Sequence, residues 1–189
     1  MADNKNNADN VSVGKPMTGG AIFAAPAGTT LPTDASTDLA TDFKNLGYIS
    51  EDGLTNEQET DSEEIKAWGG DMVANPQTSY VESYNYTLIE QNAEVFKHVY
   101  GADNVTVADS TGAISIKHNS KEKVECAIVA EILLSSNRVK RIVIPKGKIS
   151  EIGEIAYKDD EAIGYEITLK ALPDANGNSS YEYIATISE

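Results

Sequence analysis

Strand-type segments follow one another through the second half of the chain, with turn residues between them. They cover residues 113–118, 124–134, 139–144, 149–157, 163–171 and 181–187. Lys146-Gly147 and Asn176-Gly177 stand between apolar runs, as the turns of antiparallel hairpins do. Regularly spaced strands of this kind predict a mainly β protein built as an antiparallel β-sandwich or barrel.

One further strand and one helix precede this region. In residues 77–88, Tyr80, Tyr84, Tyr86 and Leu88 alternate with small polar residues, which predicts a long half-buried strand with these four side chains in the core. The helix follows, with Gly101 as its C-terminal stop. Two starts are open: Asn92 as the N-cap, or a capping box at Thr87 to Glu90, about one turn earlier. We therefore expect a single α-helix packed on the flank of the β-structure.

The first third of the chain has a different character. Residues 1–35 are polar with only short apolar pieces, so we predict an extended N-terminal arm followed by a single β domain over residues 36–189. A long acidic loop is expected near residues 50–75, because Glu51 to Glu64 holds seven acids and no base. Basic residues of the second half offer that loop a partner surface: Lys121, Lys123, Arg138, Lys140, Arg141, Lys146 and Lys148.

Charge and composition exclude several classes of protein. The formal net charge of -15 argues against tight binding to the phosphates of nucleic acid. The single Cys126 cannot form an intramolecular disulfide. Residues 1–10 have no apolar stretch behind a basic region, and no run of 18 apolar residues occurs, so we expect neither a signal peptide nor a membrane span.

No catalytic, metal or cofactor site is predicted. His98 and His118 have no metal-ligand spacing to other side chains, and Cys126 has the sequence context of a core residue. No phosphate-binding or dinucleotide-binding glycine pattern is present. The acids Asp159, Asp160 and Glu161 are expected in a solvated turn rather than in a paired-carboxylate site. The chain is therefore predicted not to be an enzyme.

Five segments, taken in order, resemble the major tail proteins of siphophages that infect Gram-positive bacteria. They are Asn10–Pro16, Leu46–Leu54, Ile65–Asp71, Arg141–Pro145 and Ile152–Thr168. The resemblance implies the tail tube fold, in which hexameric rings stack into a hollow conduit for the genome. It also implies a structural protein of the virion tail, made in the host cytoplasm.

The resemblance further implies the partners. They are other copies of the chain and the tape measure, tail terminator and distal tail proteins. Double-stranded DNA is expected only in transit. Family members lock successive rings with an N-terminal arm and a long loop, and the corresponding acids here are Glu51, Asp52, Glu57, Glu59, Asp61, Glu63 and Glu64.

The bore of such a tube needs side chains that hold phosphates weakly. The polar faces of two predicted strands fit, because the opposite face of each is apolar and is expected in the core. The candidate bore residues are Gln77, Ser79, Ser83, Asn85, Thr87, Glu166 and Thr168. Lys170 is the discordant member of this set, since a cation would retard DNA. An alternative with the same lack of catalytic chemistry is a β-sandwich binding module, such as an adhesin or a capsid decoration protein.

Overall fold

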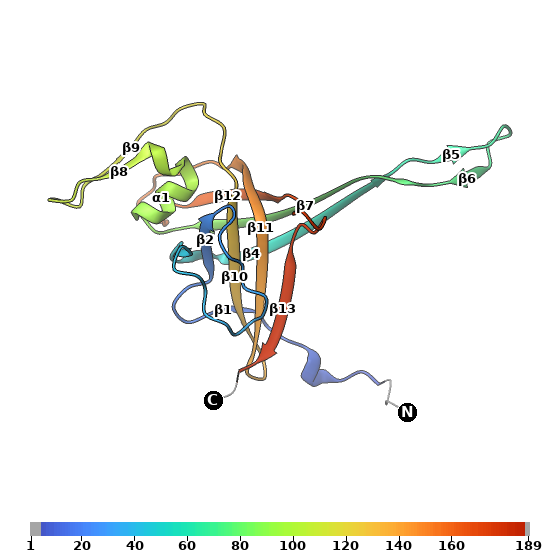
Figure 1. Ribbon diagram of the computed structural model, residues 1–189, viewed down its shortest axis with the longest axis horizontal. Coiled ribbons are helices and arrows are strands. Elements are labelled where there is room, and N and C mark those ends of the chain that lie inside the picture. Colours follow the sequence, from blue (N-terminus) through green and yellow to red (C-terminus); the bar gives the residue numbers. More distant parts are fainter. Residues whose placement is uncertain (1–4, 188–189) are drawn as a thin grey trace.

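Nine strands form one bent antiparallel sheet in the computed structural model of the protein, which describes residues 5–187 (Figure 1). The central path runs β3-β2-β10-β11-β12-β7-β4, while β1 pairs with β10 and β13 pairs with β11. The bounds are β1 Lys15–Pro16, β2 Ile22–Pro26, β3 Lys44–Asn45, β4 Ile49–Ser62, β7 Gln77–Leu88, β10 Cys126–Leu134, β11 Arg138–Ile152, β12 Tyr165–Ala171 and β13 Tyr181–Thr186. The predicted mainly β, antiparallel class with one helix is confirmed.

Strand β11 connects the two halves of the bent sheet, one containing β10 and β13 and the other containing β12, β7 and β4. Its residues 138–143 pair with β13, and its residues 147–152 pair with β12. The hairpin turn predicted at Lys146-Gly147 was wrong, because the chain runs on as one strand. Pro145 lies opposite a register shift in β10, where a missing N–H is tolerated. A Cβ at Gly147 would lie 2.8 Å from Leu169 Cδ2, so glycine permits the close approach of β12.

Helix α1 (Ala93–Tyr100) begins after Asn92 and not at the capping box of Thr87 to Glu90, and it ends at Gly101 as the sequence predicts. The Asn92 side chain accepts a hydrogen bond from the backbone N–H of Val95 at 2.9 Å, and Gly101 follows with a φ of 95°. Val95, Phe96 and Val99 pack into the larger core cluster. Beside α1 lie the short 3₁₀ helix η2 (Ala102–Asn104) and a small hairpin of β8 (Val105–Val107) and β9 (Ile114–Ile116). Among residues 5–187, no helix has the length and apolar character needed to cross a membrane.

The predicted N-terminal arm ends well before residue 35. Ala21, Ile22 and Ala25 are buried, and β2 pairs with β10 on one side and β3 on the other. An apolar segment too short to form a core alone still completes one when a complementary strand is provided. The exposed part of the arm runs from residue 5, through the 3₁₀ helix η1 (Ala8–Asn10), to about Gly14. Residues 1–4 of the predicted arm lie outside the described residues.

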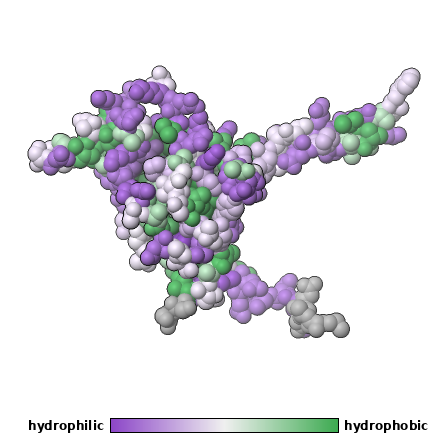
Figure 2. Space-filling model, viewed as in Figure 1, coloured by the Kyte–Doolittle hydropathy of each residue, from purple (hydrophilic) through white to green (hydrophobic). Residues whose placement is uncertain are grey.

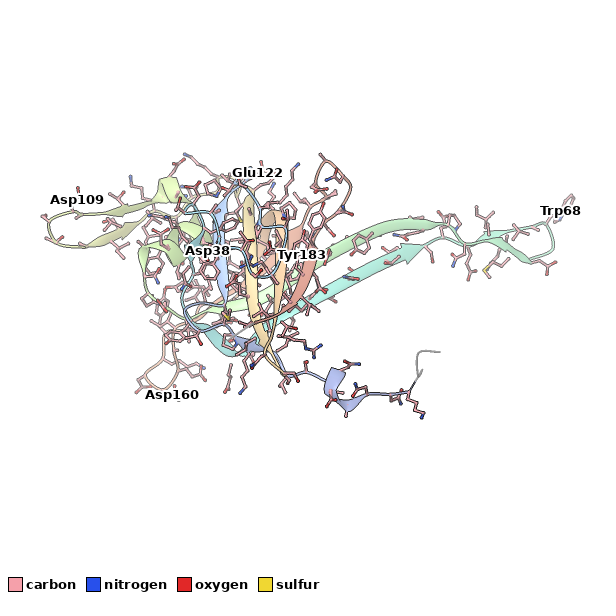
Figure 3. The ribbon with its side chains drawn as sticks, turned by 60° about the horizontal axis from the view of Figure 1, so that its bottom comes forward. Asp38, Trp68, Asp109, Glu122, Asp160 and Tyr183 are labelled. Carbon is pink, nitrogen blue, oxygen red and sulfur yellow. The ribbon has the colours of Figure 1, made fainter. Side chains whose placement is uncertain are left out.

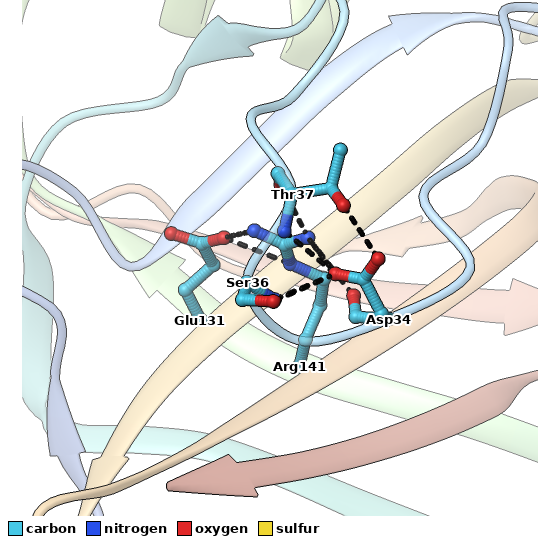
Figure 4. Close-up of polar contacts among 5 residues, drawn as sticks. All are labelled: Asp34, Ser36, Thr37, Glu131 and Arg141. Atoms are coloured by element: carbon cyan, nitrogen blue, oxygen red, sulfur yellow. Dashed lines mark hydrogen bonds and ion pairs between the residues drawn. The ribbon is translucent and has the colours of Figure 1, made fainter. Parts of the chain in front are cut away.

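The segment from β2 to β3 covers a second, smaller core cluster and is held down by Arg141 (Figure 4). The Arg141 guanidinium donates to the carbonyl oxygens of Asp34 and Thr37 at 2.9 and 2.7 Å, and it forms an ion pair with Glu131. Hydrogen bonds from the Thr37 hydroxyl and from the backbone N–H groups of Thr37 and Ser36 hold the pKa of Asp34 well below its usual range. This stretch is therefore an ordered part of the body.

Strands β4 and β7 leave the body as a long hairpin that ends in β5 (Ile65–Lys66) and β6 (Met72–Ala74) (Figure 1). The predicted irregular loop over Glu51 to Glu64 was wrong in its secondary structure, since most of it is strand β4. The seven acids are exposed, as expected. Alternation gives no signal in β4 because both faces of its outer part meet water, whereas β7 supplies a regular backbone partner.

Candidate functional site

The side chains with possible reactivity are engaged in packing rather than chemistry. His98 Nε2 lies 2.7 Å from the Tyr86 hydroxyl oxygen, and desolvation lowers the pKa of His98 to about 4. Burial raises the pKa of the Cys126 thiol to about 12, which leaves it protonated and unreactive near neutral pH. Asp159, Asp160 and Glu161 are exposed in a bend, where Lys158 pairs with Glu161 at 2.8 Å. No group of three possible metal ligands occurs among residues 5–187.

A polar face lies across β7 and β12 on the side opposite the main core. Direct cross-strand partners point to the same face of a sheet. Thr87 pairs with Glu166 and Asn85 with Thr168, and Ser83 stands beside them on β7. The structure thus brings five of the seven candidate bore residues together. The alternate residues Tyr84, Tyr86 and Leu88 are at most 3% exposed, as the alternation predicts. The prediction was wrong for Tyr80, which is 47% exposed because β12 does not reach that part of β7.

Gln77 and Ser79 do not join this group. They lie on the outer part of β7, beyond the last pairing of β7 with β12. There the Ser79 hydroxyl donates to Asp61 at 2.8 Å. These two candidates therefore belong to the projecting hairpin.

The same polar face extends to strands that sequence reasoning did not include. Thr55 and Glu57 on β4 pair with Asn85 and Ser83, and Lys148 on β11 pairs with Lys170. Lys148 also forms an ion pair with Glu122. The signal for Thr55 and Glu57 was hidden because Glu51 to Glu64 was predicted as an exposed loop. Lys170, the discordant cation, stands next to a second cation rather than next to an acid.

The acids of the hairpin are spread along it and do not form one cluster. Glu57, Glu59 and Asp61 share a face with the candidate bore residues of β7. Glu51 and Asp52 lie at the start of β4, where the pairing register shifts. Glu63 and Glu64 lie near the hairpin end, and Glu64 pairs with Lys66 at 3.2 Å. The acids therefore give the hairpin a distributed negative charge.

Most of the predicted basic partner surface is already used within the subunit. Arg141 pairs with Glu131, Lys148 with Glu122, and Lys140 with Glu182. Two others donate hydrogen bonds, Arg138 to the Ser12 hydroxyl at 2.7 Å and Lys123 to the Val99 carbonyl at 2.8 Å. Five of the seven bases therefore already have partners within the subunit, so this set does not form an unoccupied basic surface for the acidic hairpin.

Glu82 anchors the base of the hairpin, and sequence reasoning missed it. It is 2% exposed and accepts hydrogen bonds from the hydroxyls of Tyr84 and Ser180, at 2.8 and 2.9 Å, and from that of Ser179. The Asn56 amide adds a further bond at 3.1 Å. Burial raises the pKa of Glu82, but the hydrogen bonds outweigh it and the pKa lies below its usual value. An acid on the tyrosine face of β7 was the available signal.

The hairpin ends in an exposed apolar tip. Trp68 is fully exposed at the turn, and its side chain points away from the body (Figure 3). Ile65, Met72 and Val73 are each at least 50% exposed and form an apolar patch behind it (Figure 2). The turn itself is ordered, since the Ala67 N–H donates to the Asp71 carbonyl at 2.8 Å.

The sheet has open edges on both halves. Within residues 5–187, β4 pairs only with β7 and β13 pairs only with β11. Unpaired strand edges invite pairing with another chain. The protein thus combines a polar sheet face, free edges at β4 and β13 and a projecting hairpin, and it shows no catalytic constellation among the residues described.

Comparison with known proteins bears on this arrangement. No curated protein sequence matches the chain. One solved structure, the tube-terminating cap of the anti-feeding prophage, resembles it with a TM-score of 0.42 at 11% identity, covering 98% of this chain and 100% of that one. A similarity at that level supports no conclusion about the fold or function of this chain. The family model described as phage tail tube protein matches residues 5–187. This chain, with its polar sheet face, free edges and projecting hairpin, therefore belongs to the phage tail tube protein family.

Proposed function

We propose that the protein is the repeating subunit of a siphophage tail tube, in which hexameric rings stack into a conduit for the genome. The observation that carries the proposal is the polar face of β7 and β12, which continues onto the free edge strand β4. Strands from neighbouring subunits can pair along such edges and close a ring into a continuous barrel. The polar face then lines the bore.

The chemistry of that face suits passage of DNA. Ser83, Asn85, Thr87 and Thr168 are neutral, and Glu166 repels phosphate. Lys170 and Lys148 stand at one end of the face, where a cation would hold phosphate if it lay inside the bore. We place that end at the rim. DNA is then a transient passenger and not a bound ligand.

The remaining partners follow from the proposed tube. The tape measure protein would fill the bore before ejection, and the tail terminator and distal tail proteins would cap its two ends. The virion tail of a phage with a Gram-positive host is the proposed location. The part of the acidic hairpin beyond Glu82 and the exposed arm at residues 5–14 are the proposed contacts between rings, because neither packs into the core of its own subunit.

Electron microscopy of the purified protein tests the proposal. Rings or open-ended tubes of uniform bore are expected at high protein concentration, because heterologous contacts propagate along an axis. A strict monomer in light scattering at about millimolar concentration, which far exceeds the Kd of a specific interface, would contradict it.

The bore assignment has its own test. Replacing Ser83 and Asn85 with lysine is expected to leave tubes intact and to slow DNA ejection, more so at low salt. The matched control places the same two lysines at Thr106 and Ser115, a cross-strand pair on the β8–β9 hairpin. Loss of ring formation in the first variant alone would show that Ser83 and Asn85 lie in an interface and not in the bore.

A further inference from the structure

A pocket of about 440 Å³ opens on the body where the β1–β2 connection meets the start of β4. Its lining is mostly small or apolar and includes Met17, Gly19, Gly20, Asn45, Tyr48 and Glu90. This volume lies within the range of sites that enclose small organic groups. The pocket is therefore large enough for one aromatic side chain.

Hydrogen bonds hold the pocket open in the isolated subunit. The Asn45 side chain donates to the Gly19 carbonyl at 2.6 Å and accepts from the Gly47 N–H at 2.8 Å. Glu90 accepts from the Tyr48 N–H at 2.8 Å. A Cβ at Gly20 would lie 2.5 Å from Asn45, so only glycine allows this packing. The site is preformed, which lowers the entropy cost of filling it.

The apolar group that lacks a cover is the hairpin tip. At about 3.3 Å per residue, the strands place Trp68 roughly 40 Å beyond the anchor at Glu82. The hairpin points away from the body, so Trp68 cannot enter the pocket of its own chain (Figures 1 and 3). Only another molecule can bury it.

Pocket and tip are complementary in chemistry. Tyr48 is 76% exposed at the pocket and offers a ring for edge-to-face contact with an indole. The Glu90 carboxylate offers an acceptor for the indole N–H. Lys15 and Lys44 are exposed beside the lining residues Pro16 and Asn45, where they can attract the acidic hairpin. Within residues 5–187 none of the ion pairs involves Lys15, whereas the Lys44 ammonium donates to the Thr41 carbonyl at 2.8 Å.

We propose that Trp68 of one subunit inserts into the Met17–Asn45–Tyr48 pocket of a second copy of this chain. Donor and receiver are different surfaces, so the contact is heterologous and repeats from one subunit to the next. The inference rests on the proposed tube function and names the receiving site of its hairpin.

The single tryptophan of the chain makes the contact directly measurable. We expect Trp68 fluorescence of the free subunit to resemble that of tryptophan in water, and to shift to shorter wavelength with reduced acrylamide quenching in assembled tubes. Tubes in which Trp68 keeps a water-like emission and full quenching would overturn this inference and leave the tube function standing. Failure of the wild-type protein to assemble at all would overturn both.

Variants test the two sides of the contact separately. Trp68→Ser is expected to raise the protein concentration needed for tubes about tenfold or more, as loss of an aromatic hot spot does, with partial rescue by Trp68→Phe. Thr18→Phe places a ring in the receiving pocket from an exposed turn, and it is expected to raise the protein concentration needed for tubes in the same way. Thr111→Phe, in the β8–β9 turn, is the matched control. Unchanged assembly of both Trp68→Ser and Thr18→Phe would overturn the inference.

A crosslink gives an answer that does not depend on how well a variant assembles. A Trp68→Cys chain mixed with a Met17→Cys chain is expected to form a mixed disulfide dimer under mild oxidation. Replacing the Met17→Cys partner with a Ser110→Cys partner is expected to give none. The half-buried Cys126 is not expected to compete, since its thiol donates to the Gly147 carbonyl and desolvation raises its pKa. Equal yields from the two mixtures would contradict the proposed pairing.

Discussion

The inner part of β7, residues 82–88, and its outer part, residues 77–81, share one alternating pattern but differ in how far their side chains are buried. Tyr84, in the inner half, is 1% exposed, and Tyr80, in the outer half, is 47% exposed. The difference lies in their neighbours. The inner half lies between β4 and β12, whereas the outer half has β4 alone. Alternation therefore marks which residues share a face, and tertiary packing decides whether that face is covered.

Glu82 stands where the two halves meet. It is the last residue of β7 that pairs with β12, and its hydrogen bonds reach Asn56 on β4 and Ser179 before β13. These bonds fix the point at which the hairpin leaves the body. The hairpin can then present its tip at a defined distance, which is what a contact between rings would require.

Removing the outer hairpin has the largest expected effect. Replacing residues 60–80 with Asn-Gly, joining Glu59 to Val81, is expected to abolish tube formation while the body stays folded, because the removed residues contribute little to either core cluster. Circular dichroism and electron microscopy measure the two outcomes. Shortening the β8–β9 hairpin in the same way is the control. An unfolded body would show that the hairpin supports the core.

Leu88→Ala tests the inner half of the comparison. Leu88 is fully buried, so the change is expected to lower the free energy of unfolding by about 2–5 kcal/mol through lost contacts and a cavity. Urea denaturation at neutral pH provides the measurement. A loss well under about 1 kcal/mol would mean that the core relaxes around the gap and that burial along β7 matters less than we argue.

Glu82→Gln tests the junction. The new amide places two donors where hydroxyl donors converge, and we expect a loss of about 1–3 kcal/mol at pH 7. Because the pKa of Glu82 is depressed, its stabilisation is present above about pH 4.5 and is lost as the pH falls through the folded-state pKa. The gap between wild type and variant is thus expected to narrow below pH 4.5. Glu59→Gln, on the outer hairpin, is the control. An equal loss of unfolding free energy in that variant would mean that Glu82 has no special role at the junction.

Tyr80→Ala has the smallest expected effect on folding. Tyr80 lies on the same face of β7 as Tyr84 but lacks a covering layer, so its loss is expected to change the free energy of unfolding by less than about 0.5 kcal/mol. Urea denaturation of Tyr80→Ala and Leu88→Ala under the same conditions compares their free energies of unfolding. A cost approaching that of Leu88→Ala would mean that the outer hairpin is buried in solution.

Local sequence patterns were sufficient for the helix and for the faces of the regular strands. Asn92 and Gly101 bound α1 through capping, which depends on residues within one turn. Alternation grouped Ser83, Asn85 and Thr87 on one face of β7 and Glu166 and Thr168 on one face of β12. The register that places these two faces side by side was observed only in the structure.

Tertiary structure decided everything that required a partner distant in sequence. Ile22 is in the core because β2 pairs with β10, and residues 49–62 form a strand because they pair with β7. Glu82 became an anchor only when Ser179 and Ser180 reached it from the far end of the chain. A short period or a cap is readable locally, whereas strand pairing and the satisfaction of a buried charge depend on groups that only folding brings together.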